Sequence, residues 1–174
     1  MTEPFSLWLV PSENHNKHLQ DAINRLSQEY STPLLEPHVT LYGRIVGEKA
    51  EMLEKTRELA GRISQLSIQF TGFYQSNQFF RSLFMGVKHT SELDDAYRTA
   101  QFIFESFLPS GYRGREFIPH LSLMYGNIPE EQKKRIIQSL DSFLLDSFFV
   151  NRISLYSLGE EPASWTKVQD FLME

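Results

Sequence analysis

One short pattern occurs twice in this chain, and it constrains the fold more than any other feature of the sequence. A proline, a histidine, an aliphatic residue, a hydroxyl residue and a leucine follow one another from position 37 and again from position 119. Successive side chains of a β-strand point to opposite faces. His38 and Thr40 therefore share one face of their strand. His120 and Ser122 do the same, so the pattern predicts two strands that each present an imidazole and a hydroxyl group to one side.

The spacing of apolar residues predicts an alternation of strands and helices along the chain. Apolar residues at every second position indicate a strand, and apolar residues at intervals of three and four indicate a helix. The predicted strands cover 5–10, 36–46, 66–75, 78–88, 117–126, 148–159 and 164–172. The predicted helices cover 19–30, 48–63, 93–107 and 129–141.

The separation of the two motifs suggests an internal duplication. The histidines are 82 residues apart (120 minus 38), close to half of the 174-residue chain, and each motif strand is followed at once by a helix. Two diverged α+β halves without a linker would give this arrangement. We therefore expect one domain over residues 1–174, with a bilobal, pseudo-symmetric α+β fold and a cleft between two sheets.

The composition limits the partners that this chain can bind. The sequence contains no cysteine, which excludes disulfides and thiolate metal ligands. Its 22 acidic and 17 basic residues give a formal net charge of −5, and the densest basic cluster, at 133–135, falls in a predicted surface helix. Long nucleic acids are usually held by clustered Lys and Arg residues. With no apolar run of roughly 18 residues and no leader segment, we expect a cytoplasmic monomer without nucleic-acid or membrane partners.

Two facing imidazoles suit the cleavage of a phosphodiester. The ordinary pKa of histidine, about 6.5, allows one ring to accept a proton from water while the other protonates the departing oxygen. The hydroxyl groups of Thr40 and Ser122 would donate hydrogen bonds to the non-bridging phosphate oxygens. The motifs contain no carboxylate, so we expect neither a metal ion nor another cofactor. A single motif of this kind is more often structural, and two unrelated core histidines are the alternative to the paired interpretation.

The residues around the motifs carry a resemblance to a known family. The paired motifs at this separation resemble the two-histidine phosphoesterase superfamily. Over nearly its whole length, the chain resembles one branch of this superfamily more closely, the cyclic phosphodiesterases known from plants and yeast. The stretches that carry the resemblance are S-L-W-L-V-P from position 6, P-H-V-T from 37, P-H-L-S-L-M-Y from 119, and Trp165.

The resemblance implies a fold, an activity and a set of site residues. The implied fold is bilobal, with two antiparallel sheets facing a central cleft and helices outside. The implied reaction is metal-independent opening of a 2′,3′-cyclic nucleotide to a 2′-phosphate, or of ADP-ribose 1″,2″-cyclic phosphate to the 1″-phosphate. By analogy His120 is the base and His38 the acid, while Thr40 and Ser122 bind phosphate. Plant enzymes of this branch contain cysteines, whereas this chain has none. Redox control known in the plant enzymes therefore does not carry over.

The same resemblance places aromatic residues in the cleft as substrate contacts. Trp8, Phe80 and Tyr125 fall at matching positions. Strand alternation supports Trp8 and Phe80, because each lies opposite an apolar face of its predicted strand. For both rings, packing in the core is the alternative to contact with substrate. Tyr125 instead alternates with the core residues of its strand, so either the strand ends there or the ring packs inward. Tyr42 shares the alternation of His38 and Thr40 and is a weaker candidate for the rim.

Two other functions stay open at this point. One is an RNA 2′,3′-cyclic phosphodiesterase or an enzyme similar to the 2′-5′ RNA ligases, against which the acidic charge argues. The other is a non-catalytic nucleotide binder in which the histidines only hold phosphate. Arg113 or Arg115 would reach a substrate phosphate if their loop approached the site, although a solvated loop is favoured. Glu36 is a candidate for orienting His38, with an exposed surface carboxylate as the favoured alternative.

Overall fold

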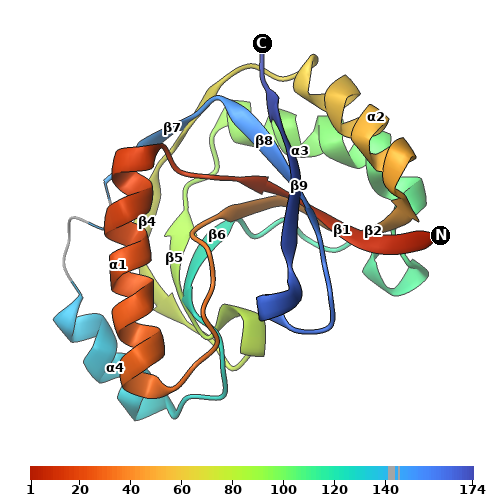
Figure 1. Cartoon of the computed structure of the whole chain (residues 1–174). Helices are drawn as coiled ribbons and strands as arrows, with labels where there is room; N and C mark the ends of the chain where they lie inside the picture. Colours follow the sequence, from red (N-terminus) through yellow and green to blue (C-terminus); the bar gives the residue numbers. More distant parts are fainter. Residues whose placement is uncertain (141–143, 145) are drawn as a thin grey trace.

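The computed structural model describes residues 1–140, 144 and 146–174, which form an α+β fold (Figure 1). The predicted end of the last helix, at 141, lies outside the described residues. The helices are α1 (Glu13–Tyr30), α2 (Lys49–Ala60), α3 (Ser91–Phe104) and α4 (Glu130–Ser139). The strands are β1 (Thr2–Leu9), β2 (Val39–Glu48), β3 (Leu66–Ile68), β4 (Phe70–Gln75), β5 (Leu83–Val87), β6 (His120–Met124), β7 (Phe148–Val150), β8 (Arg152–Ser157) and β9 (Thr166–Leu172).

The strands form two antiparallel sheets, which confirms the predicted class. The larger sheet has the order β4-β5-β6-β2-β1-β8-β9, and β3 pairs with β7 in the smaller one. The two motif strands, β2 and β6, are neighbours where the halves β4-β5-β6 and β2-β1-β8-β9 meet, and they pair at Val39 opposite Leu121. The pairing therefore brings two segments together that lie far apart in the sequence.

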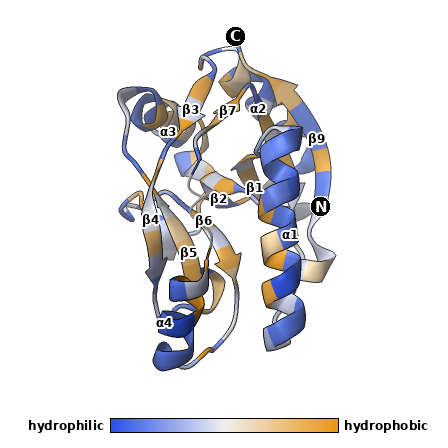
Figure 2. Ribbon diagram, turned by 90° about the vertical axis from the view of Figure 1, so that its left-hand side faces the viewer, coloured by the Kyte–Doolittle hydropathy of each residue, from blue (hydrophilic) through white to orange (hydrophobic). Residues whose placement is uncertain are grey.

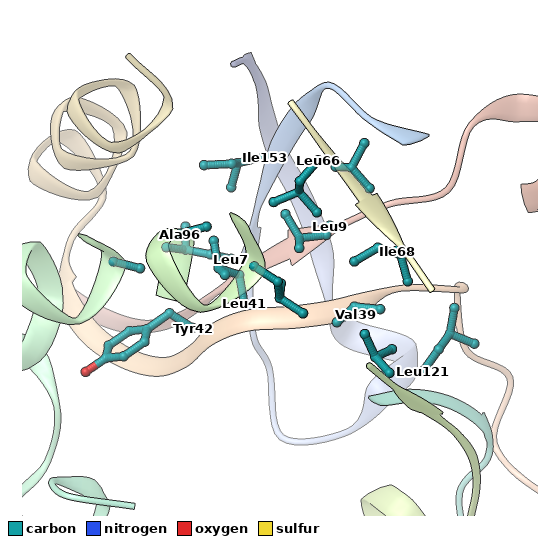
Figure 3. Close-up of a cluster of buried hydrophobic side chains, with 14 of the residues drawn as sticks. Leu7, Leu9, Val39, Leu41, Tyr42, Leu66, Ile68, Ala96, Leu121 and Ile153 are labelled. Carbon is teal, nitrogen blue, oxygen red and sulfur yellow. The ribbon is translucent and has the colours of Figure 1, made fainter. Parts of the chain in front are cut away.

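One face of the larger sheet packs against helices to form the hydrophobic core. Phe5, Leu7 and Leu9 of β1 are fully buried, as their alternation predicts. Figure 3 shows Leu7 and Leu9 among the side chains of β2, β6, β8, β3 and α3. In Figure 2 hydrophobic colour appears on several strands and on part of α1, while the ribbon of α4 is mainly in the hydrophilic colour. None of the described helices has the length and apolarity to cross a membrane.

The segment predicted as a strand over 78–88 begins differently. Residues Phe79–Arg81 form a short 3₁₀ turn, and the strand starts only at Leu83. The cause is Ser76, whose hydroxyl donates to the Arg81 carbonyl and accepts from the backbone N–H of Gln78. Such local bonds from a serine side chain compete with strand pairing. The loop between β4 and β5 is therefore wider than a two-residue hairpin turn.

Two further predictions need correction. The predicted strands 66–75 and 148–159 each divide, because β3 and β7 leave the larger sheet and pair with each other. The basic cluster of helix α4 is not wholly on the surface, since Lys133 is 1% exposed. Its Nζ donates a 2.5 Å hydrogen bond to the carbonyl of Ser76. The basic cluster at 133–135 thus contains one buried cation that fastens α4 to the loop before the 3₁₀ turn.

Candidate active site

A cleft of about 590 Å³ lies on the face of the larger sheet opposite the helix-packed core. Along the strands, residues that line the cleft alternate with apolar residues that are buried in the core. This is the alternation of side chains that the two motifs predict. The volume falls within the range of about 300–1,000 Å³ that is typical of small-molecule sites. All seven candidate site residues line this cleft: Trp8, His38, Thr40, Phe80, His120, Ser122 and Tyr125.

The register between β2 and β6 fixes how the two motifs face each other. The strands are antiparallel and pair at Val39 opposite Leu121. The same register places Thr40 opposite His120 and His38 opposite Ser122. Directly opposed Cβ atoms lie about 5 Å apart in such a pair, and diagonal ones about 7–8 Å. The two imidazoles are therefore diagonal neighbours on one face, each opposite the hydroxyl of the other motif.

Each imidazole is oriented by the carbonyl two residues before it. His38 Nδ1 lies 2.7 Å from the Glu36 oxygen, and His120 Nδ1 lies 2.8 Å from the Ile118 oxygen. A carbonyl oxygen only accepts hydrogen bonds, so Nδ1 carries the proton in both rings. In the neutral form Nε2 is then the basic nitrogen. Both motifs thus hold their imidazole in the same tautomer, with Nε2 left for proton transfer.

Burial shifts both histidines toward the neutral form. It lowers the pKa of His38 from 6.5 to about 4; the Glu36 hydrogen bond opposes this shift, and the charge of His120 adds to it. Burial also lowers the pKa of His120, opposed by the Ile118 hydrogen bond and assisted by the positive charge of Arg81. Desolvation disfavours the charged form of an imidazole. In the free protein at neutral pH, His38 is therefore neutral.

Trp8 holds His38 in place through ring stacking. The indole lies parallel to the imidazole of His38, with centroids 3.6 Å apart, and Tyr156 stacks on its other face, also at 3.6 Å. Its Nε1 donates to Ser6 Oγ at 2.9 Å. Because both ring faces are covered, Trp8 has no face to offer to a base or ribose. Trp8 lines the cleft, but its packing between His38 and Tyr156 leaves no open ring face for the predicted stacking on substrate.

Glu36 contributes to the site through two different groups. Its backbone carbonyl orients His38, and its carboxylate accepts a hydrogen bond from the hydroxyl of Tyr156. Tyr156 in turn covers Trp8. The side chain is exposed, as the favoured alternative states, and it is also hydrogen-bonded to Tyr156. It fastens the far side of the stack that encloses His38.

Three aromatic rings form a second wall of the cleft. Phe80 contacts Tyr125 with centroids 5.4 Å apart and Trp165 at 6.0 Å, and Tyr125 lies 6.1 Å from Trp165. Phe80 is 40% exposed, so its ring is accessible from the cleft, although it belongs to the 3₁₀ turn and not to a strand. Tyr125 follows the last residue of β6, Met124, so strand alternation no longer applies to it. It lines the cleft with 3% exposure.

The two motif hydroxyls differ in their surroundings. Ser122 Oγ donates to the carbonyl oxygen of Phe80 at 3.0 Å, which ties β6 to the 3₁₀ turn. Thr40 lines the cleft and makes no side-chain hydrogen bond to any described residue, so its hydroxyl has no competing protein acceptor there. A phosphate oxygen can therefore be bound by Thr40 directly, whereas Ser122 has to rotate its proton away from Phe80.

The comparison with protein families agrees with this geometry. Residues 1–157 match the model of the family described as cyclic phosphodiesterase-like protein. The chain belongs to this family. A cyclic phosphodiesterase of Arabidopsis thaliana is 28% identical to this chain in an alignment 165 residues long, which covers 90% of this chain and 86% of the relative. The resemblance inferred from the motifs is thereby confirmed, and the chain is identified as a phosphodiesterase.

Solved structures show that the fold of the enzyme is shared more widely. Escherichia coli LigT, in a structure complexed with 3′-AMP, superimposes with a TM-score of 0.68 and 11% identity over 99% of both chains. The protein TT0787 of Thermus thermophilus superimposes with a TM-score of 0.67 and 14% identity over 98% of this chain and 97% of its own. At such low identity these matches show a shared fold and nothing further.

Several residues of the enzyme's cleft were not predicted as site residues. Arg44 in the lining gave no signal, because its role depends on a strand irregularity that no local pattern reveals. The same holds for Tyr156, which is outside the lining and acts by stacking on Trp8. Trp165 is indicated only by the family resemblance. Arg115 does line the cleft, whereas Arg113 donates to the carbonyls of Leu108 and Ser106 and is absent from the lining. Tyr42 is 5% exposed and packs in the core (Figure 3).

Proposed function

We propose that this enzyme opens small cyclic phosphates by metal-independent acid–base catalysis with its two histidines. The proposed substrates are 2′,3′-cyclic nucleotides, opened to 2′-phosphates, and ADP-ribose 1″,2″-cyclic phosphate, opened to the 1″-phosphate. One observation carries the proposal. Two imidazoles lie on one face of adjacent strands, in one cleft, and each presents Nε2 as its basic nitrogen.

The proposed reaction divides one proton transfer between the two rings. His120 Nε2 accepts a proton from water as the water oxygen forms a bond to phosphorus. The bond between phosphorus and the leaving ribose oxygen breaks, and this oxygen takes a proton from His38 Nε2. After turnover the base is protonated and the acid is neutral, so exchange with solvent restores both. An in-line displacement needs the two groups on opposite sides of phosphorus, which diagonal neighbours can provide.

The acid role of His38 rests on analogy, and it requires conditions that the free protein does not provide. An acid has to be protonated, whereas burial keeps His38 neutral in the free protein. A bound phosphate anion favours the imidazolium form. The indole of Trp8, stacked on the ring at 3.6 Å, favours it as well through a cation–π contact. Substrate binding would therefore supply the conditions under which His38 acquires its proton.

The hydroxyls and the aromatic wall complete the proposed binding mode. Thr40 and Ser122 would donate to the non-bridging oxygens, where negative charge concentrates during attack. Phe80 and Trp165 line the cleft beside them and would contact the base or ribose. Stacking of this kind contributes about 1–3 kcal/mol per base in single-strand binders.

A substrate screen with product assignment tests the proposal. Turnover of the four nucleoside 2′,3′-cyclic phosphates and of the cyclic ADP-ribose phosphate should give 2′- or 1″-phosphates and persist in excess chelator. His38→Ala and His120→Ala should each lower kcat by a factor of roughly 10³ or more, since each loses a proton-transfer group. His18→Ala, which changes an exposed histidine of α1, is the matched control and should retain full activity.

The same experiments separate the alternatives. Tight nucleotide binding by His120→Ala without turnover supports the enzyme mechanism. Tight binding by the unaltered protein without any turnover would instead indicate a nucleotide binder. Preference for oligonucleotide over mononucleotide cyclic phosphates would indicate an RNA-end enzyme. Loss of turnover in chelator would reject the metal-independent mechanism.

A further inference from the structure

Two arginines converge on one tyrosine ring in the lining of the cleft. The guanidinium carbon of Arg44 lies 4.8 Å from the centroid of Tyr112, and that of Arg115 lies 4.2 Å from the same centroid. Arg44 Nη1 also donates to the Tyr112 hydroxyl at 2.9 Å, and Arg115 Nε donates to the Gly111 carbonyl at 3.2 Å. Arg44, Tyr112 and Arg115 all line the cleft that holds both histidines. Two cations are thus fixed beside the candidate active site.

Neither arginine has a carboxylate partner within the described ranges. The ion pairs formed there involve other residues, although the chain carries a net charge of −5. Glu160 lines the same cleft and Glu116 lines the adjoining cavity, and neither forms an ion pair with these cations. Two positive charges that share one ring repel each other. A bound anion would relieve this repulsion.

The backbone at Arg44 is strained in a way that aims its side chain. The register between β1 and β2 shifts from Ser6 opposite Gly43 to Phe5 opposite Ile45, which leaves Arg44 as the unpaired residue of a bulge. Its φ of 61° lies in the left-handed region that favours glycine. Bulges next to active sites often redirect a side chain. Here the bulge directs a cation toward Tyr112 where glycine would be the less strained residue.

The arginines are connected to the histidines by continuous open space. A second cavity, of about 190 Å³, adjoins the cleft, and Thr40, His120, Tyr112 and Arg115 line both. A substrate whose cyclic phosphate sits at Thr40 and His120 can therefore extend toward the arginines without leaving the cleft. Guanidinium groups are well suited to bind phosphate oxygens in this setting.

We propose that Arg44 and Arg115 form a second anion subsite, which binds a phosphate or diphosphate group that the substrate carries in addition to its cyclic phosphate. This inference rests on the proposed cyclic phosphodiesterase function and narrows its substrate class. The enzyme would select cyclic phosphates with a second phosphate on the same nucleoside over those without one. Tyr112 would act as a positioning residue that holds both guanidinium groups.

A pair of substrates that differ by one phosphate tests the subsite. We compare kcat/KM for adenosine 2′,3′-cyclic phosphate and for the same compound with a 5′-phosphate. The unaltered enzyme should prefer the 5′-phosphorylated compound, and the double variant Arg44→Gln/Arg115→Gln should lose roughly tenfold of that preference. Its kcat/KM for the unphosphorylated compound should fall by a clearly smaller factor than its kcat/KM for the 5′-phosphorylated compound. Arg113→Gln removes a charge from the same loop outside the cleft and is the matched control.

The outcomes separate failure of the subsite from failure of the proposed function. Equal losses on both compounds, or no change on either, would overturn the subsite while the cyclic phosphodiesterase function stands. If the unaltered protein turns over neither compound, the proposed function fails. Calorimetry with adenosine 2′,5′-bisphosphate and adenosine 2′-phosphate then decides on the subsite. The bisphosphate should bind more tightly to the unaltered protein, and the double variant should lose this difference; equal affinities would overturn the inference.

Discussion

The enclosure of His38 determines how the charge of the proposed catalytic pair depends on pH. Its ring is stacked on the indole of Trp8 and is 6% exposed, and burial lowers its pKa to about 4. Burial also lowers the pKa of His120 below 6.5. Two histidines that face one substrate are coupled, so the observed pKa values belong to the pair. Both values of the free enzyme therefore lie on the acid side of an ordinary histidine.

This arrangement predicts a bell-shaped pH profile that is displaced toward acid. The rate rises with pH as the base loses its proton, and it falls again when the acid loses its proton. Because both pKa values are lowered, kcat/KM should reach its maximum below about pH 6.5. Initial rates with one cyclic nucleotide between pH 4 and 8 provide the measurement. A maximum above pH 7 would contradict the lowered values.

Residue-level predictions from the sequence succeeded where a local pattern sufficed. The alternation in the two motifs predicted that all four polar side chains meet in one cleft, because period two is a property of any strand. The same reasoning gave Trp8 the correct face but the wrong contact. Whether an indole stacks on substrate or on His38 depends on Tyr156, which lies nearly 150 residues away in the chain. Sequence periodicity carries no information about such a partner.

At the scale of elements, α4 supports the cleft through one buried cation. Lys133 Nζ binds the Ser76 carbonyl, and Ser76 closes the loop that leads into the 3₁₀ turn with Phe80. The carbonyl of Phe80, within this 3₁₀ turn, accepts a hydrogen bond from the hydroxyl of Ser122. The position of the aromatic wall thus depends on a helix that does not itself line the cleft.

We expect Lys133→Ala to lower the free energy of unfolding by about 2–4 kcal/mol, because it removes a fully buried side chain and leaves a carbonyl unpaired. KM for a cyclic nucleotide should rise as the 3₁₀ turn loosens. Urea denaturation and steady-state kinetics measure the two effects. Lys134→Ala, which changes the exposed neighbour paired with Glu130, should leave both nearly unchanged. Equal effects of the two variants would show that the buried bond does not fasten the turn.

Irregular strands explain why some elements were mispredicted. Tyr42 shares the alternation of Thr40 in the sequence, yet it lies in the core. The register between β1 and β2 shifts between Leu7 and Trp8, so Leu7 lies opposite Tyr42 and Trp8 opposite Thr40. One inserted residue reverses the faces beyond it. The separation of β3 from β4 is a similar case, because only the pairing partner decides to which sheet a short strand belongs.

For the molecule as a whole, the lowered pKa of His38 couples folding to pH. The unfolded chain binds a proton at this histidine with the ordinary pKa of 6.5, and the folded chain only at about 4. Between these values the unfolded state holds more protons, so stability falls as the pH falls. The contribution is complete above pH 6.5 and is lost toward pH 4.

His38→Gln isolates this contribution from that of the carboxylates, which titrate in the same range. From pH 7 to 4, the unaltered protein should lose up to about 3 kcal/mol more stability than the variant. Urea denaturation at a series of pH values measures the difference. Parallel pH dependences for the two proteins would mean that His38 titrates normally in the folded state.

The place where β2 joins β6 has a consequence for how this enzyme tolerates change. His38 and His120 each precede a residue of the pair Val39 and Leu121, so main-chain hydrogen bonding sets the spacing of the imidazoles. Amino-acid substitutions in surface loops and outer helices therefore leave the spacing of the imidazoles unchanged. A slip of one position at the junction would instead turn the polar residues of one motif into the apolar interior. Partly assembled forms would consequently be inactive, and catalytic turnover would report that both halves of the chain have docked in their native alignment.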